Sequence, residues 1–122
     1  MRILIAEDDP DLRDLLQDEL EDAGYDTTIC INGQKALEQI EKTSEQIDLL
    51  LTDIMMPGGT GIELAGKLVG QRPRLSVLYM SGYTDDAVIR NGMLARGSAF
   101  IQKPFTPKEL LRRVKQILEL GV

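Results

Sequence analysis

Three carboxylates of this chain stand directly after short apolar runs. Glu7 and Asp8 follow the run Arg2–Ala6, and Asp53 follows the run Leu49–Thr52. If the two runs are neighbouring strands of one sheet, the three side chains crowd into one pocket, and their repulsion demands a cation. Mg2+ suits such a site, because it prefers a few carboxylates, a main-chain carbonyl, water and a phosphoryl oxygen.

Asp53 has the surroundings of a nucleophile for phosphoryl transfer. It stands alone after its run, and the apolar stretch Ile54–Met56 and a Pro-Gly-Gly stretch, expected to be mobile with free amides, follow it. A carboxylate can attack phosphorus to form an acyl phosphate, provided that nearby cations neutralise the phosphoryl oxygens. Lys103, after the run Ala99–Gln102, carries such a cation, and the hydroxyl of Ser81 can donate to a phosphoryl oxygen. We therefore assign the metal to Glu7 and Asp8 and the nucleophilic role to Asp53.

The elements that must position these residues follow from five apolar runs that alternate with helical spacing. The runs are four or five residues long and mostly unalternating, which is typical of buried parallel strands. They are Arg2–Ala6, Thr27–Ile31, Leu49–Thr52, Ser76–Met80 and Ala99–Gln102. This pattern predicts one α/β domain over residues 1–122, with a doubly wound, five-stranded parallel sheet, (βα)5, in the order 2-1-3-4-5. The ligand site of such a sheet lies at the carboxyl ends of the strands, where the order reverses.

The predicted helices carry recognisable start and stop signals. Asp9-Pro10 is a cap followed by a proline, and Gly24 is a stop signal for the first helix. Thr106 with Glu109 three residues later forms a capping box for the last helix. The segment 87–96 is the weakest helix, because Asn-Gly interrupts it at 91–92.

Composition excludes several classes of protein. The chain has no histidine and a single cysteine, Cys30, so a Ser-His-Asp triad, a Cys-His pair and a histidine-ligated zinc site are all absent. The net charge of −6 argues against broad binding to nucleic acid or to an anionic membrane. One unpaired cysteine, no apolar run long enough to span a membrane and no leader pattern lead us to expect a cytoplasmic protein.

With these residues in view, the chain resembles the receiver domains of two-component response regulators over nearly its whole length. The resemblance lies in four motifs, which are ILIAEDDP at 3–10, LTDIMMP at 51–57 with Gly61, MSGYT at 80–84, and QKPF at 102–105. It implies the flavodoxin-like strand order. The third and fourth motifs look most like receivers of hybrid sensor kinases.

The resemblance also implies a role for each site residue. Asp53 matches the aspartate that takes the phosphoryl group from a phosphohistidine, Asp8 the direct Mg2+ ligand, and Glu7 the companion acid that usually acts through water. The carbonyl of Met55 matches the main-chain metal ligand. Ser81 matches the switch hydroxyl and Lys103 the lysine that pairs with the phosphoryl group.

Phe100 matches the switch aromatic on the last strand, where the alternative is an ordinary core position. Two departures from the family pattern are the extra methylene of Glu7, in place of an aspartate, and the missing hydroxyl of Phe100, where tyrosine is frequent.

The resulting prediction is a phosphorylation-dependent signalling switch that is not an enzyme as an isolated domain. Its partners are a histidine kinase or a histidine phosphotransfer domain, with a fused or separate output domain, and it binds no nucleic acid and no membrane directly. We expect a monomer or a weak dimer, with a partner surface made of the segment 87–96, the strand Ala99–Gln102 and the last helix. Basic residues of that helix, Lys108, Arg112, Arg113 and Lys115, suit acidic partners or form an ordinary solvated face.

Three rival functions stay open. A degenerate receiver would bind partners without being phosphorylated, although the presence of all five polar site residues argues against it. A nucleotide-binding protein is indicated by 61–67 (GIELAGK), which nearly spells a phosphate-binding loop but has Leu68 where Ser or Thr should hold Mg2+. A flavin-binding electron carrier is the third, disfavoured because aromatic residues make up only 4% of the chain.

Overall fold

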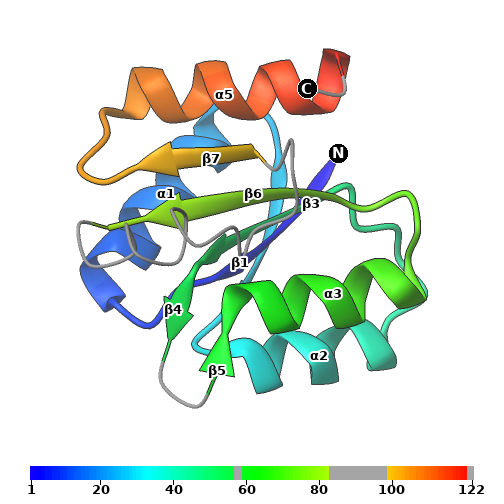
Figure 1. Ribbon diagram of the computed structural model, residues 1–122. Coiled ribbons are helices and arrows are strands. Elements are labelled where there is room, and N and C mark those ends of the chain that lie inside the picture. Colours follow the sequence, from blue (N-terminus) through cyan, green and yellow to red (C-terminus); the bar gives the residue numbers. More distant parts are fainter. Residues whose placement is uncertain (57–58, 83–98, 121–122) are drawn as a thin grey trace.

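A computed structural model describes residues 1–56, 59–82 and 99–120 of the 122. Five strands form one parallel sheet in the order β2-β1-β3-β6-β7, which is the predicted order 2-1-3-4-5 of the five runs (Figure 1). The strands are β1 (Arg2–Ala6), β2 (Asp26–Cys30), β3 (Leu49–Asp53), β6 (Ser76–Ser81) and β7 (Ala99–Gln102). The predicted α/β fold class and strand order are confirmed.

Helices cover both faces of the sheet. They are α1 (Pro10–Asp22), α2 (Gly33–Lys42), α3 (Gly61–Gln71) and α5 (Pro107–Leu120), while the predicted helix 87–96 lies outside the described residues. In Figure 1, α1 and α5 lie on one side of the sheet, and α2 and α3 lie on the other. None of the helices described in the structure is long and apolar enough to cross a lipid bilayer.

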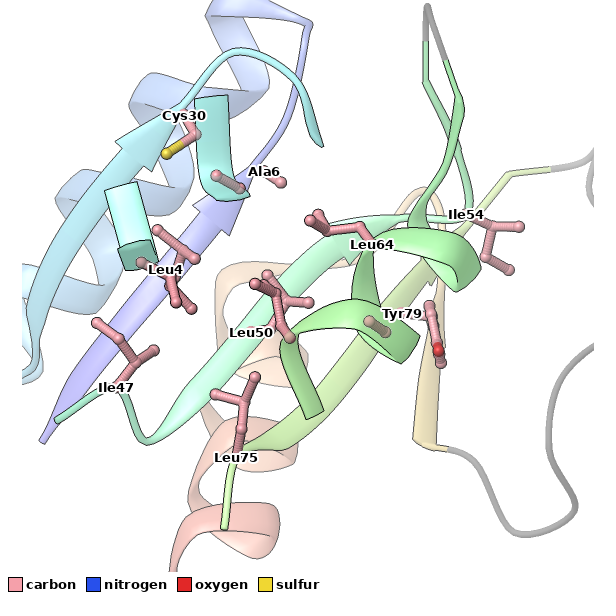
Figure 2. Close-up of a cluster of buried hydrophobic side chains, with 13 residues drawn as sticks. Leu4, Ala6, Cys30, Ile47, Leu50, Ile54, Leu64, Leu75 and Tyr79 are labelled. Atoms are coloured by element: carbon pink, nitrogen blue, oxygen red, sulfur yellow. The ribbon is translucent and has the colours of Figure 1, made fainter. Parts of the chain in front are cut away.

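Side-chain alternation along the central strands builds one core on each face. Ile3 and Ile5 of β1 belong to the core under α1 and α5, whereas Leu4 and Ala6 belong to the core under α2 and α3. Figure 2 shows the second core, in which Leu4 of β1 and Leu50 of β3 belong to the same buried cluster as Leu64 of α3. The unalternating apolar runs of β1, β3 and β6 are thus explained, because these central strands bury side chains on both faces of the sheet.

Local signals at the helix ends are also confirmed. Asp9 is the N-cap of α1 and accepts a hydrogen bond from Asp11 N, and Gly24 adopts a positive φ of 97° after the helix. Thr106 Oγ1 accepts from Glu109 N at 3.1 Å, which is one half of the predicted capping box.

Three of the five predicted strands have different bounds in the structure. Strand β2 is shifted one residue toward the N-terminus, because its pairing with β1 begins at Asp26, and Ile31 is left half exposed beyond the strand. Strands β3 and β6 each include the polar residue that follows the apolar run, because Asp53 pairs with Met80 and Ser81 with Gln102. The stretch after Asp53 contains a short antiparallel pair, β4 (Met55–Met56) with β5 (Gly59–Thr60), that the sequence did not predict.

Candidate functional site

The carboxyl ends of β1 and β3 bring the three predicted acids together. Ala6 pairs with Thr52 in the parallel register, so Glu7 and Asp53 follow at the same level of two neighbouring strands. One carboxylate oxygen from each of Glu7, Asp8 and Asp53 lies within 4.8 Å of the other two. Glu7 and Asp53 are buried and Asp8 is exposed, so the cluster has a closed floor and a side that is open to solvent.

Asp9, the third acid of the motif, belongs to the helix and not to the cluster. Its carboxylate caps the start of α1, and its own N–H donates to Glu7 Oε1 at 3.1 Å. The turn that starts α1 therefore separates the three consecutive acids, leaving two for the site and one for the helix end.

Lys103 reaches the acidic cluster from the end of the edge strand β7, which lies two strands away from β3. It follows the edge strand β7, and its N–H donates to Ser81 O at 2.8 Å. Its ammonium forms an ion pair with Asp53 Oδ1 and lies 3.6 Å from Glu7 Oε2. The long stem spans the width of β6, so one amine serves two buried carboxylates.

Burial and charge shift the ionisation of this group of residues. The pKa of Glu7 is raised to about 8, first by burial and then by the nearby carboxylate of Asp53. The positive charge of Lys103 opposes this shift. Burial works against the charged amine of Lys103, yet the contact with Asp53 and the charge of Glu7 leave its pKa above the ordinary value. Without a metal ion, burial and the neighbouring charge of Asp53 therefore favour the protonated form of Glu7.

The structure places the other three predicted site residues as follows. Ser81 is buried at the end of β6, one strand away from Asp53. Met55 lies two residues after Asp53, with a side chain that is 52% exposed. Phe100 is 44% exposed on the edge strand β7, so the alternative of a core position for this residue is wrong.

Two further residues bond to the main chain at Asp53 and Ile54, and the sequence did not predict their role. Thr52 Oγ1 donates to Asp53 O at 3.0 Å. Gly61, at the start of α3, donates its N–H to Ile54 O at 2.7 Å, and a Cβ at this position would lie only 1.9 Å from Asp53 O. The spacing of Gly61 after Asp53 was visible as part of a motif, but the close approach of the two backbones required coordinates.

The stretch 61–67 that resembles a phosphate-binding loop is helical. Helix α3 begins at Gly61, and Leu64 and Leu68 bury their side chains in the core. A loop that wraps a phosphate needs free main-chain amides after a strand, which a helix does not offer beyond its first turn. The nucleotide-binding alternative loses its only motif.

Comparisons with known proteins agree with this geometry. Residues 3–115 match the family described as response regulator receiver domain. The chain is 38% identical over 117 residues to the response regulator receiver protein CpdR of Brucella abortus, with 96% of each chain covered. It is 35% identical to the transcriptional regulatory protein YrkP of Bacillus subtilis and 32% identical to the DNA-binding response regulator MtrA of Mycolicibacterium smegmatis, and it spans about half of their length, 47% and 49%.

Solved structures give the same result. The receiver domain of the hybrid histidine kinase CckA superposes with a TM-score of 0.81 at 32% identity, covering 98% of this chain and 100% of that one. The response regulator TrrA of Thermotoga maritima, solved in complex with Mg2+-BeF, gives a TM-score of 0.79 at 32% identity, covering 96% and 98%. The relatives thus include a receiver domain of a hybrid kinase, as the third and fourth motifs indicated.

Proposed function

This chain belongs to the family of response regulator receiver domains, which act by phosphorylation in two-component signalling, and from that premise we propose that Asp53 is its phosphoryl acceptor. One observation supports this choice above the rest. Of the three clustered carboxylates, Asp53 makes the closer of the two described ion pairs with Lys103, and Thr52 and Gly61 hold the main chain at Asp53 and Ile54. A nucleophile that is held in place loses little entropy on reaching the transition state.

The residues at the site fit a divalent cation. Glu7 Oε2 is buried and accepts no hydrogen bond from the described residues. Lys103 Nζ lies 3.6 Å away, close enough for an ion pair but beyond hydrogen-bonding distance. The neighbouring ligands are all oxygens, which Mg2+ prefers over nitrogen or sulfur donors. Asp8 and Asp53 would hold the ion directly together with the carbonyl of Met55, and Glu7 would act through water. When bound, Mg2+ offsets negative charge on the phosphoryl oxygens.

The reaction follows from the position of the acceptor. A carboxylate oxygen of Asp53 attacks the phosphorus of a phosphohistidine on a histidine kinase or histidine phosphotransfer domain. The new O–P bond forms as the N–P bond breaks, and the imidazole leaves with the bonding electron pair and takes a proton from solvent. Lys103 exchanges its contact with the carboxylate for one with a phosphoryl oxygen, so its charge is present before the reaction and is used during it.

The acyl phosphate then changes the surface around the edge strand β7. Ser81 and Lys103 are bonded through the main chain at the ends of β6 and β7, so a pull on the Ser81 hydroxyl is transmitted to the edge strand. Phe100, which is partly exposed on β7, would turn inward. The partner surface then comprises β7, α5 with its basic residues Lys108, Arg112, Arg113 and Lys115, and the segment 87–96, which lies outside the described residues.

We further propose that residues 1–122 form a single domain without enzymatic activity of its own, located in the cytoplasm. The domain passes its signal to a fused or separate output domain. In solution it is a monomer, or a weak dimer that forms through the partner surface. A degenerate receiver that binds without phosphorylation is the competing function. A Mg2+-dependent change in Tyr fluorescence on adding beryllofluoride, a phosphoryl mimic, separates the two.

Mass spectrometry of the intact protein tests the acceptor. Incubation with Mg2+ and acetyl phosphate should add one phosphoryl group, which alkali then removes, and EDTA should prevent the addition. The variant D53A should stay unlabelled, whereas the matched variant D48A, at the amino end of β3, should be labelled like the wild type. Full labelling of D53A would refute the assignment.

A further inference from the structure

The peptide that joins Glu7 to Asp8 is held on both sides. Glu7 N donates to Cys30 O at 3.1 Å, which extends the ladder between β1 and β2 by one residue. Glu7 O accepts from Arg13 Nη1, also at 3.1 Å. Because a peptide unit is planar, a bond that fixes the carbonyl of Glu7 also fixes the direction in which the chain enters Asp8.

The side chain of Asp8 depends on that main chain for its position. Asp8 is exposed, and its carboxylate accepts no hydrogen bond and forms no ion pair with any residue that the structure describes. Glu7 differs, because its Oε1 accepts from Asp9 N and its Oε2 lies near Lys103. Among the residues that the structure describes, it is therefore the backbone that keeps the Asp8 carboxylate within 4.8 Å of the other two acids.

Arg13 bonds to a main-chain carbonyl although many carboxylates are close to it in the sequence. It is the one base among ten carboxylates in residues 7–26, yet within the described ranges it forms no ion pair. Its guanidinium reaches back from α1 to the uncharged carbonyl at the end of β1. A bond from a charged donor to a carbonyl is stronger and more directional than a bond between neutral groups, so it suits the task of orienting a peptide.

We propose that Arg13 is a positioning residue for the metal site: it orients the Glu7–Asp8 peptide so that the Asp8 carboxylate faces the ion before the ion binds. This inference rests on the proposed function of the acidic cluster as a Mg2+ site. Charge alone would have the opposite effect, because removing a cation near a divalent ion strengthens binding of that ion. The sign of the change in Mg2+ affinity therefore separates positioning from simple electrostatics.

Mg2+ titration by calorimetry provides the test. The variant R13M removes the donor and the charge, and we expect its Mg2+ dissociation constant to rise about tenfold, as is typical when a residue that orients a metal ligand is lost. In metal-free R13M, the backbone 15N order parameter of Asp8 should fall below the value of about 0.85 that marks rigid backbone, whereas the metal-free wild type should keep that value. An unchanged or smaller dissociation constant would overturn the proposal.

Two further variants keep the comparison decisive. R72M is the matched control, because Arg72 also donates to main-chain carbonyls, those of Ile40, Thr43 and Glu45, but at the amino ends of the strands. It should lower stability and leave Mg2+ affinity unchanged, and an equal loss of affinity in R72M would attribute the R13M effect to general destabilisation. If R13M does not fold, R13Q serves instead, with the same expected direction. Since the titration needs no phosphodonor, a failure of labelling at Asp53 would count against the proposed acceptor and leave this result standing.

Discussion

Replacing Gly61 by alanine perturbs the site at its most crowded backbone contact. The new Cβ would lie 1.9 Å from Asp53 O and 3.0 Å from Thr52 Oγ1. Non-bonded atoms of this kind keep at least about 3.0 Å apart, so one of the two backbones must move by about 1 Å. The closer atom belongs to the main chain of the acceptor itself, so it cannot move aside as the end of a flexible side chain can.

The expected cost is large for one methyl group. Overpacking of a tight contact typically costs about 1–3 kcal/mol, and a clash with backbone belongs at the upper end of that range. A loss of about 3 kcal/mol divided by a urea slope of about 1.5–2 kcal/mol per M lowers the midpoint of unfolding by roughly 1.5–2 M. Because the displaced atoms carry Asp53, labelling by acetyl phosphate should also slow in the protein that remains folded.

Gly66 of the same helix supplies the control. It is exposed, and a Cβ there would meet nothing within 4 Å. The variant G66A should therefore gain about 0.5–1 kcal/mol from the better helix propensity of alanine, with unchanged labelling. Equal midpoints for G61A and G66A in urea unfolding followed by circular dichroism would refute this reasoning, because the close contact with Asp53 exists at position 61 and is absent at position 66.

Three more predictions follow from the buried charges and the core. In EDTA, the raised pKa of Glu7 stabilises the fold fully below pH 4.5, and that contribution is lost as the pH rises through about 8, at up to about 1.4 kcal/mol per pH unit. Urea unfolding at pH 5–8 should show this fall in the wild type but not in E7Q, and identical pH profiles would contradict it. The variant K103M leaves Glu7 and Asp53 without their cation and should lower the free energy of unfolding by about 3 kcal/mol, against no change for the exposed K35M. The variant L16A should cost about 3–5 kcal/mol by calorimetry, since Leu16 is fully buried, and a loss below 1 kcal/mol would mean that the helix α1 packs differently.

Most of the fold was predictable because its signals are local. Each strand that buries both faces reads as an unbroken apolar run, and β1 and β7 were predicted with the bounds that the structure has. The cap at Asp9 and the stop at Gly24 act within a few residues, so they too were visible in the sequence. The pair β4–β5 was missed because two-residue strands leave no periodic pattern.

The sequence by itself determined which residues carry the chemistry, since the polar residue after each apolar run marks the carboxyl end of a parallel strand. It did not determine how those residues share charge. The raised pKa of Glu7, the ion pairs of Lys103 and the exposure of Phe100 depend on contacts between residues that lie up to 96 positions apart in the chain. The close approach of Gly61 to Asp53 and the bond from Arg13 to Glu7 were likewise decided only by the tertiary structure, because burial and short-range contact are properties of packed surfaces and not of residue order.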